Sequence, residues 1–212
     1  FLRPLGLRLP YVISGSGKTV PEDTGTYPKS ALVTTDTEIE SQSMVDYLCS
    51  CGHKRIAFIT SGDEGLGRCH LNGYKRSLEK NGLEYDEKLI IRLKPGKRIY
   101  TIENGYNCTC ELLKSGVDFS CIYAISDTLA VGACRAVIDS GKRVPEDYCV
   151  AGADGQDIAE YYHPSITTLK YPRVEIALQS VRTLFDLINR KKVVKRQILG
   201  GTLIERESTR KL

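Results

Sequence analysis

Charged side chains follow three apolar, β-type runs of this sequence, at the points where those runs end. In chain order they are Asp63, Glu64, Arg68, Asp127 and Asp154. A guanidinium and a carboxylate that share one crevice clamp ligand hydroxyl groups through charge-assisted hydrogen bonds. In a parallel sheet, ligands bind beyond the carboxyl ends of the strands. We therefore expect these charged side chains to converge on one ligand-binding crevice.

The sequence shows no arrangement typical of catalysis. Its three histidines are His53, His70 and His163, and no G-x-S-x-G segment accompanies them. Residues 15–19 (GSGKT) resemble the end of a phosphate-binding loop, but Val12 stands where the first glycine belongs. The glycine-rich loop at residues 62–67 lacks the G-x-G-x-x-G spacing of a dinucleotide site. We predict no catalytic residues, no cofactor and no enzymatic activity.

The eight cysteines do not show metal-binding spacing. Two pairs are separated by one residue, at Cys49-Ser-Cys51 and Cys108-Thr-Cys110, and no C-x-x-C occurs. Several of the single cysteines lie within apolar, periodic segments. We therefore expect reduced, buried thiols and no metal site, which indicates a cytoplasmic protein.

The elements that must position these residues alternate between strands and helices. Strands are predicted at residues 11–14, 31–34, 56–60, 88–93, 121–126, 148–153, 166–170 and 197–205. Helices are predicted at residues 38–51, 101–114, 127–140 and 173–191, with a further helix ending at Gly82. The apolar stripe of the helix at 173–191 is Val174, Ala177, Leu178, Val181, Leu184, Phe185 and Ile188. Such alternation indicates an α/β protein with a mostly parallel sheet.

Composition excludes several classes of protein. A length of 212 residues suggests one large domain or two small ones. Thirty Lys and Arg against 26 Asp and Glu leave a net charge of +4, too small to indicate nucleic-acid binding by this chain. No stretch approaches the roughly 18 apolar residues of a membrane span, so we expect no membrane association.

Six segments resemble, in order and spacing, motifs of the LacI/GalR family of bacterial transcription regulators. They are Pro10-Tyr-Val-Ile, Gly52-His-Lys-Arg-Ile-Ala, Arg68-x4-Gly73-Tyr74, Ser126-Asp127-x2-Ala130-x-Gly132, Val144-Pro-Glu-Asp with Val150-x-Gly152-x-Asp154, and Pro164-Ser-Ile-Thr-Thr-Leu. The resemblance runs from about residue 9 to the end of the sequence.

The resemblance implies a type I periplasmic-binding-protein-like fold, a two-lobed parallel-sheet sandwich joined by three crossovers. Residues 1–33 and 173–199 would form part of the N-terminal lobe. Residues 34–172 and 200–212 would form a nearly complete C-terminal lobe. The family's DNA-binding helix-turn-helix would precede residue 1 and is absent from this sequence. An incomplete lobe predicts an uncovered apolar face and aggregation.

The resemblance also implies a function and a site. The chain would be the effector-sensing and dimerisation region of a regulator, binding a sugar or similar metabolite in the interlobe cleft. Arg68, Asp154 and Ser126 would face the effector, and the ring of Tyr100 would stack on it. Asp127 either caps the helix it opens, the preferred interpretation, or contacts the ligand. The full-length protein would be a homodimer that binds operator DNA through the missing domain.

Departures from the family pattern bear on the ligand. Ser126 stands where the family usually has Asn, Gly15 where an acid often ends a strand, and Gly155 where a second acid is common. These changes predict pocket chemistry different from that of a typical hexose site.

Three other functions stay open at this point. One is a soluble solute-binding receptor of a sugar uptake system with the same fold, which an upstream signal peptide would favour. Another is a regulator whose partner is a phosphocarrier protein rather than a sugar. The third is an enzyme, for which no nucleophile and base pair emerges.

Overall fold

The computed structural model describes residues 9–15, 29–94, 96 and 98–212. The chain divides into two compact units, each assembled from separate stretches of sequence. Unit 1 comprises Phe1–Asp36 and Pro172–Gly200, and unit 2 comprises Thr37–Tyr171 and Gly201–Leu212. The chain therefore passes from one unit to the other three times.

Unit 2 is built around a six-stranded sheet. Its strands, in spatial order, are β4 (Ile90–Arg92), β3 (Ile56–Thr60), β5 (Cys121–Ala124), β6 (Cys149–Asp154), β7 (Thr167–Lys170) and β9 (Thr202–Ile204). All neighbouring strands pair in parallel except β7 and β9, which are antiparallel. The prediction of a mostly parallel α/β sheet is confirmed.

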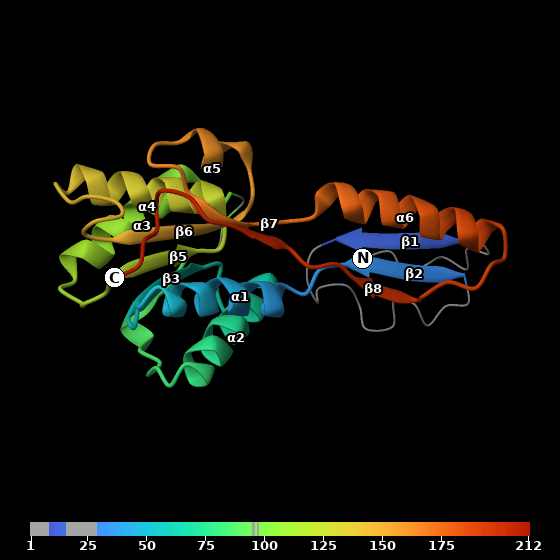
Figure 1. The fold of residues 1–212 in the computed structure, drawn as a ribbon, viewed down its shortest axis with the longest axis horizontal. Helices are drawn as coiled ribbons and strands as arrows, with labels where there is room; N and C mark the ends of the chain where they lie inside the picture. Colours follow the sequence, from blue (N-terminus) through green and yellow to red (C-terminus); the bar gives the residue numbers. More distant parts are fainter. Residues whose placement is uncertain (1–8, 16–28, 95, 97) are drawn as a thin grey trace. The chain divides into compact units, whose positions relative to one another are not determined.

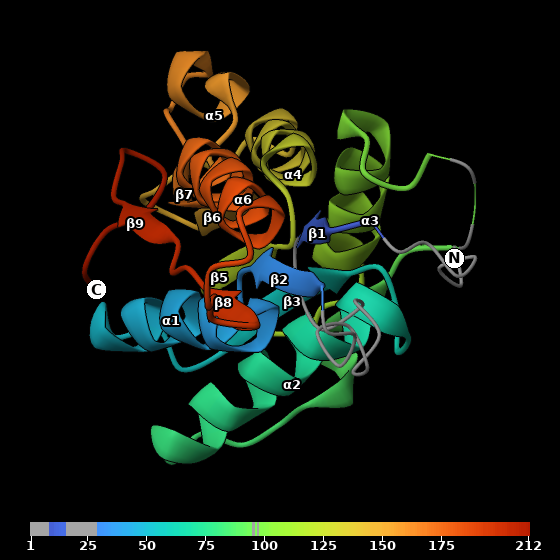
Figure 2. The same cartoon turned by 90° about the vertical axis from the view of Figure 1, so that its right-hand side faces the viewer.

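Helices cover both faces of this sheet. The four long ones are α1 (Thr37–Ser50), α2 (Gly65–Lys80), α3 (Ile102–Lys114) and α4 (Asp127–Asp139). The pair α1 and α2 pack together on one face, and α3 and α4 pack together on the other (Figures 1 and 2). Two short elements complete the unit, the 3₁₀ turn η1 (Glu87–Leu89) and α5 (Asp157–Tyr161).

The core of unit 2 lies against the central strands. Every residue of β3 and β5 is buried, as expected for a parallel sheet covered on both faces. The ring of Phe58 stacks on those of Tyr74 and Tyr123, with centroids 4.9 and 5.2 Å away. The Tyr74 hydroxyl donates a hydrogen bond to the Ile56 carbonyl at 2.8 Å, which satisfies its polar end inside the core.

The last residues of the chain return to this core after β9. The Val150 N–H donates to the Ser208 carbonyl at 2.9 Å, and the Ser208 hydroxyl donates back to the Val150 carbonyl at 2.5 Å. The Leu212 N–H donates to the Cys51 carbonyl at 2.8 Å. Residues 201–212 are thus an integral part of unit 2.

The described residues of unit 1, 9–15, 29–36 and 172–200, form a three-stranded parallel sheet and one helix. The strands, in spatial order, are β1 (Tyr11–Gly15), β2 (Ser30–Thr34) and β8 (Arg196–Ile198), and α6 (Arg173–Ile188) packs on β1 and β2. The buried positions of α6 are Ile176, Thr183 and Leu187. Its exposed large apolar residues, each 53–66% exposed, are Val174, Leu178, Val181, Phe185 and Ile188. Most of the apolar stripe predicted from the sequence therefore lies away from the sheet.

Three elements of the structure differ from the sequence prediction. The strand predicted at 88–93 divides into η1 and β4, because the Asp86 side chain accepts a hydrogen bond from Lys88 N–H at 3.0 Å and begins a turn. The predicted tail strand at 197–205 divides into β8 and β9, which lie in different sheets. The short helix α5 was not predicted.

Candidate functional site

The carboxyl ends of the unit 2 strands form the edge at which a ligand is expected. From β3 the chain goes to β4 on one side and then to β5 on the other side of β3. The loops that leave β3 and β5 therefore diverge, and ligands of open α/β sheets bind at such a reversal of strand order. Ser126 and Asp127 follow β5, and Arg68 lies near the start of the helix that follows β3.

Ser126 is the N-cap of α4. It has extended backbone angles, and its hydroxyl accepts a hydrogen bond from the Leu129 N–H at 3.3 Å. The side chain is buried. The structure thus gives the capping position to Ser126, so the interpretation of Asp127 as the cap is wrong. Serine and aspartate are about equally good caps, which is why adjacent candidates are hard to distinguish from sequence.

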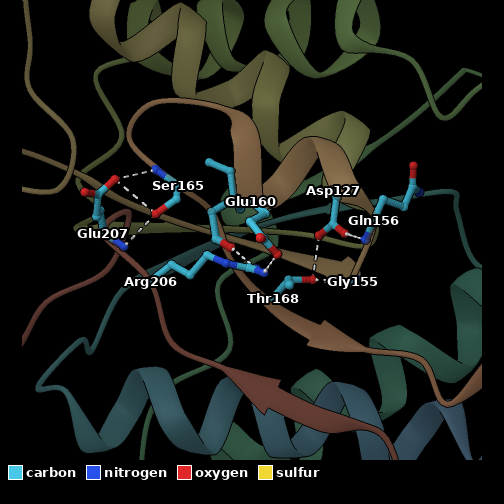
Figure 3. A network of polar contacts seen from close by, with 9 residues as sticks. Asp127, Gly155, Gln156, Glu160, Ser165, Thr168, Arg206 and Glu207 are labelled. Atoms are coloured by element: carbon cyan, nitrogen blue, oxygen red, sulfur yellow. Dashed lines mark hydrogen bonds and ion pairs between the residues drawn. The ribbon is translucent and has the colours of Figure 1, made fainter.

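Asp127 points instead toward the strand ends beside it, and it is fully buried. One carboxylate oxygen, Oδ1, accepts from the Thr168 hydroxyl at 2.5 Å (Figure 3). The other, Oδ2, accepts from the Gln156 N–H at 2.6 Å. Burial raises the pKa of the Asp127 carboxyl to about 6, a rise that these two hydrogen bonds only partly offset.

Asp154 ends β6 with a backbone φ of 101°, which residues with a side chain rarely adopt. Its carboxylate is half-buried and accepts from the Gln156 side-chain amide at 3.0 Å. Its backbone carbonyl accepts from the Tyr171 N–H at 3.2 Å. Strained non-glycine residues of this kind concentrate at functional sites, where the surroundings hold them in place.

Arg68 and Tyr100 are exposed on segments that follow β3 and β4. Among the residues that the structure describes, none forms a hydrogen bond or ion pair with the Arg68 guanidinium. Tyr100 is 44% exposed and lies in the loop before α3. Both side chains are thus accessible to a ligand from solvent.

Asp63, which sequence reasoning placed in the same crevice, has a partner of its own. Its carboxylate accepts from Arg92 Nε at 2.8 Å, and Arg92 also donates to Glu87 at 2.5 Å. These bonds tie the loop after β3 to the end of β4. Arg92 was not among the predicted site residues.

Sequence reasoning also missed Thr168 and Gln156, which hold Asp127. Thr168 is the second threonine of the Ser-Ile-Thr-Thr-Leu segment, and it lies on β7 beside Gly152 of β6. The strand β7 reads Thr-Thr-Leu-Lys, so Thr168 does not stand out in it as a lone polar residue. Its role becomes apparent only once β6 and β7 are known to be neighbours.

Figure 3 also shows how the C-terminal stretch is tied to the loop that follows α5. Arg206 donates to the Ile166 carbonyl at 3.0 Å and forms an ion pair with Glu160 at 3.3 Å. Glu207 accepts from the N–H and the hydroxyl of Ser165, at 2.8 and 3.0 Å. These contacts fix the segment that leads into β7.

The histidines are placed to act as structural residues. His53 and His163 lie before the amino ends of β3 and β7, away from the edge described above. Buried His53 has its Nδ1 2.9 Å from the Ser120 hydroxyl, and burial lowers its pKa. Burial also lowers the pKa of His70 to about 4, so its ring is neutral at physiological pH.

The described residues hold no feature typical of a metal site or a membrane span. Within the described ranges, no three His, Cys, Asp or Glu side chains are grouped so as to hold a metal ion. The eight cysteines are unpaired. No described helix is both long and apolar enough to span a membrane. Residues 16–19 of the phosphate-loop candidate lie outside the described residues. The charged and polar side chains at the carboxyl edge of the unit 2 sheet can hold a polar ligand through ionic contacts and hydrogen bonds.

Comparison with known proteins gives a consistent family. The model of the periplasmic binding protein-like domain matches residues 45–209. The transcriptional regulator MalR of Clostridium butyricum is 41% identical over 146 residues, which cover 69% of this chain and 42% of that protein. The regulator CelR of Thermobifida fusca is 32% identical over 202 residues, covering 94% of this chain and 56% of that protein. This chain therefore spans about half the length of the curated relatives it matches.

A solved structure agrees with these relatives. The complex of the transcriptional regulator CelR with cellobiose is similar with a TM-score of 0.79 and 31% identity, covering 94% of this chain and 58% of that one. The family model covers well over half of the sequence, and the motif order, the parallel sheet and the solved relative point the same way. The chain belongs to the periplasmic-binding-protein-like family, as an effector-binding region of the LacI/GalR type.

Proposed function

We propose that this chain is the effector-sensing and dimerisation region of a LacI/GalR-type transcriptional regulator. Its ligand is a sugar or a similar polyhydroxylated metabolite, bound at the carboxyl edge of the unit 2 sheet. The observation that carries the proposal is Asp154, a carboxylate held at a strained backbone position on that edge. In the intact protein, ligand binding changes the affinity of a homodimer for operator DNA.

The site residues divide into two kinds in this proposal. Arg68 and Asp154 contact the ligand directly, because a free guanidinium and a half-buried carboxylate complement neighbouring hydroxyl groups. Tyr100 offers an aromatic face for the apolar side of a sugar ring. Ser126 and Asp127 are buried and engaged with their own chain, so they shape the edge on which the ligand lies.

A sugar is the preferred class because of the site chemistry and because one relative, CelR, is described in complex with cellobiose. The site offers one cation and one anion in addition to uncharged donors. Such a set suits a neutral ligand with several hydroxyls better than a strongly charged one.

Titration of the purified chain with cellobiose, maltose and ribose, by calorimetry and by thermal shift, tests this proposal. We expect at least one of these sugars to bind, and Arg68→Ala and Asp154→Asn to weaken it by about 10- to 100-fold, as expected when a charge-assisted hydrogen bond is lost. Arg182→Ala is the matched control, since Arg182 is also an exposed helical arginine but lies on α6. Unchanged affinity in both site variants would remove these residues from the site.

A further inference from the structure

We propose that Asp127 and Thr168 are a positioning pair that locks residues 154–156 in the backbone conformation that presents the Asp154 carboxylate to the ligand. The inference rests on the proposed function for the identity of the site. The lock itself is a property of the chain without any ligand. Two buried residues, Asp127 and Thr168, thus fix the backbone conformation of a third, the half-buried Asp154.

The lock is a closed set of hydrogen bonds among three segments. The Thr168 hydroxyl on β7 donates to Asp127 Oδ1 at 2.5 Å and accepts from the Gly155 N–H at 3.2 Å. Asp127 Oδ2, at the start of α4, accepts from the Gln156 N–H at 2.6 Å. Two successive backbone donors of the loop are therefore held by two side chains that are bonded to each other (Figure 3).

Close packing leaves this loop little room to move. A Cβ added to Gly152 would lie 2.5 Å from Asp127 Oδ1, so the carboxylate rests directly on the backbone of β6. A Cβ added to Gly155, whose φ is +64°, would lie 2.6 Å from the Lys170 side chain on β7. The loop is thus pressed between the start of α4 and the end of β7.

The strain at Asp154 explains why a lock is needed. A non-glycine residue at a φ of 101° returns to an ordinary conformation unless its neighbours prevent it. Its carboxylate accepts from Gln156 Nε2, so the orientation of Asp154 follows the position of Gln156. Freeing the Gly155 and Gln156 N–H groups therefore also frees the Asp154 carboxylate.

Amide hydrogen exchange at Gly155 and Gln156 tests the lock in the absence of ligand. We expect Thr168→Val, which keeps the shape and removes the hydroxyl, to speed this exchange about tenfold or more. Thr168→Ser, which restores a hydroxyl, should keep exchange near the wild-type rate. Thr109→Val is the matched control, because Thr109 is a buried threonine whose hydroxyl has no partner among the described residues. Wild-type exchange in Thr168→Val would overturn the proposal.

Titration of the same variants with whichever of cellobiose, maltose and ribose binds the wild-type chain then tests the positioning role. We expect Thr168→Val to weaken binding of that sugar about tenfold, with binding restored in Thr168→Ser and unaffected in Thr109→Val. Wild-type affinity in Thr168→Val would show that the pair does not serve the ligand. If cellobiose, maltose and ribose all fail to bind the wild-type chain, the proposed sugar site is wrong. The exchange rates still decide whether the lock exists.

Discussion

Asp127 carries a negative charge in the interior of unit 2, and that charge has a cost. The folded environment raises the pKa of this carboxyl from 3.8 to about 6, mainly through burial, and the neighbouring carboxylate of Asp154 adds to the rise. Arg206 and the hydrogen bonds from Thr168 and Gln156 act in the opposite direction. The folded state therefore binds a proton here more tightly than the unfolded state does.

The sign of the resulting pH dependence follows from this difference. The contribution of Asp127 to the free energy of unfolding is fully present below pH 4 and is lost as pH rises through about 6. We expect the stability of the wild type relative to Asp127→Asn to be greater at pH 5 than at pH 7.5, by ~1 kcal/mol. Urea unfolding of both proteins at the two pH values measures this. A difference that stays constant with pH would contradict the assignment.

Sequence patterns identified only some of the site residues and their contacts. The rule that charged residues after strand ends share an edge correctly located Asp127 and Asp154 at adjacent strand ends. It could not supply the positive φ of Asp154, which depends on bonds to residues far along the chain. Nor could it foresee that Arg92 holds Asp63, since that pairing depends on β4 lying beside β3. The binding roles of Arg68, Ser126 and Tyr100 stay predictions.

At the scale of elements, the helices α3 and α4 meet through their glycines. A Cβ added to Gly105 of α3 would lie well inside van der Waals distance of the Leu129 carbonyl. One added to Gly132 of α4 would meet the Ile102 carbonyl in the same way. The two helix backbones are therefore in direct contact, and this contact sets how α4 presents its first turn to the site.

Gly132→Ala should separate these helices. We expect a loss of about 1–3 kcal/mol in the free energy of unfolding, the usual cost of overpacking a close-packed interface. Denaturant unfolding measures it, with Gly200→Ala as the control because nothing lies within 4 Å of a Cβ added there. Equal stability of the two variants would mean that α3 and α4 accommodate the added methyl group without loss of stability.

Element predictions succeeded where local pattern and tertiary environment agree. The buried strand at 56–60 and the helix after Thr101 lie where they were expected, since an apolar run and a helical pattern identify them locally. The tail at 197–205 reads as one β-rich segment, yet its halves pair with β2 and β7. Local propensity cannot show that a strand changes sheets, because the change is decided by distant partners.

At the scale of the whole molecule, α6 leaves an apolar face in water. Five large apolar side chains repeat along it at alternating spacings of four and three residues, the pattern of a helix that packs against another helix. The described residues bury only the opposite side of α6. A contiguous apolar stripe of this kind promotes association between molecules.

We therefore expect the isolated chain to self-associate at micromolar concentrations. Phe185→Lys should reduce this association, because it places a charge in the middle of the stripe. Light scattering and sedimentation velocity measure it, with Val194→Lys as the control for an exposed apolar residue outside α6. A wild-type chain that stays monomeric at micromolar concentrations would show that the apolar stripe of α6 does not promote self-association.

The interleaving of the two units has a consequence for synthesis on the ribosome. Unit 2 lacks β9 and the C-terminal stretch that is hydrogen-bonded to Val150 until residues 201–212 emerge, and these are made after α6 of unit 1. Vectorial synthesis releases N-terminal segments first. For the time needed to make residues 172–200, β7 is therefore an open sheet edge on a nascent chain, and a chaperone that covers strand edges would find its substrate there.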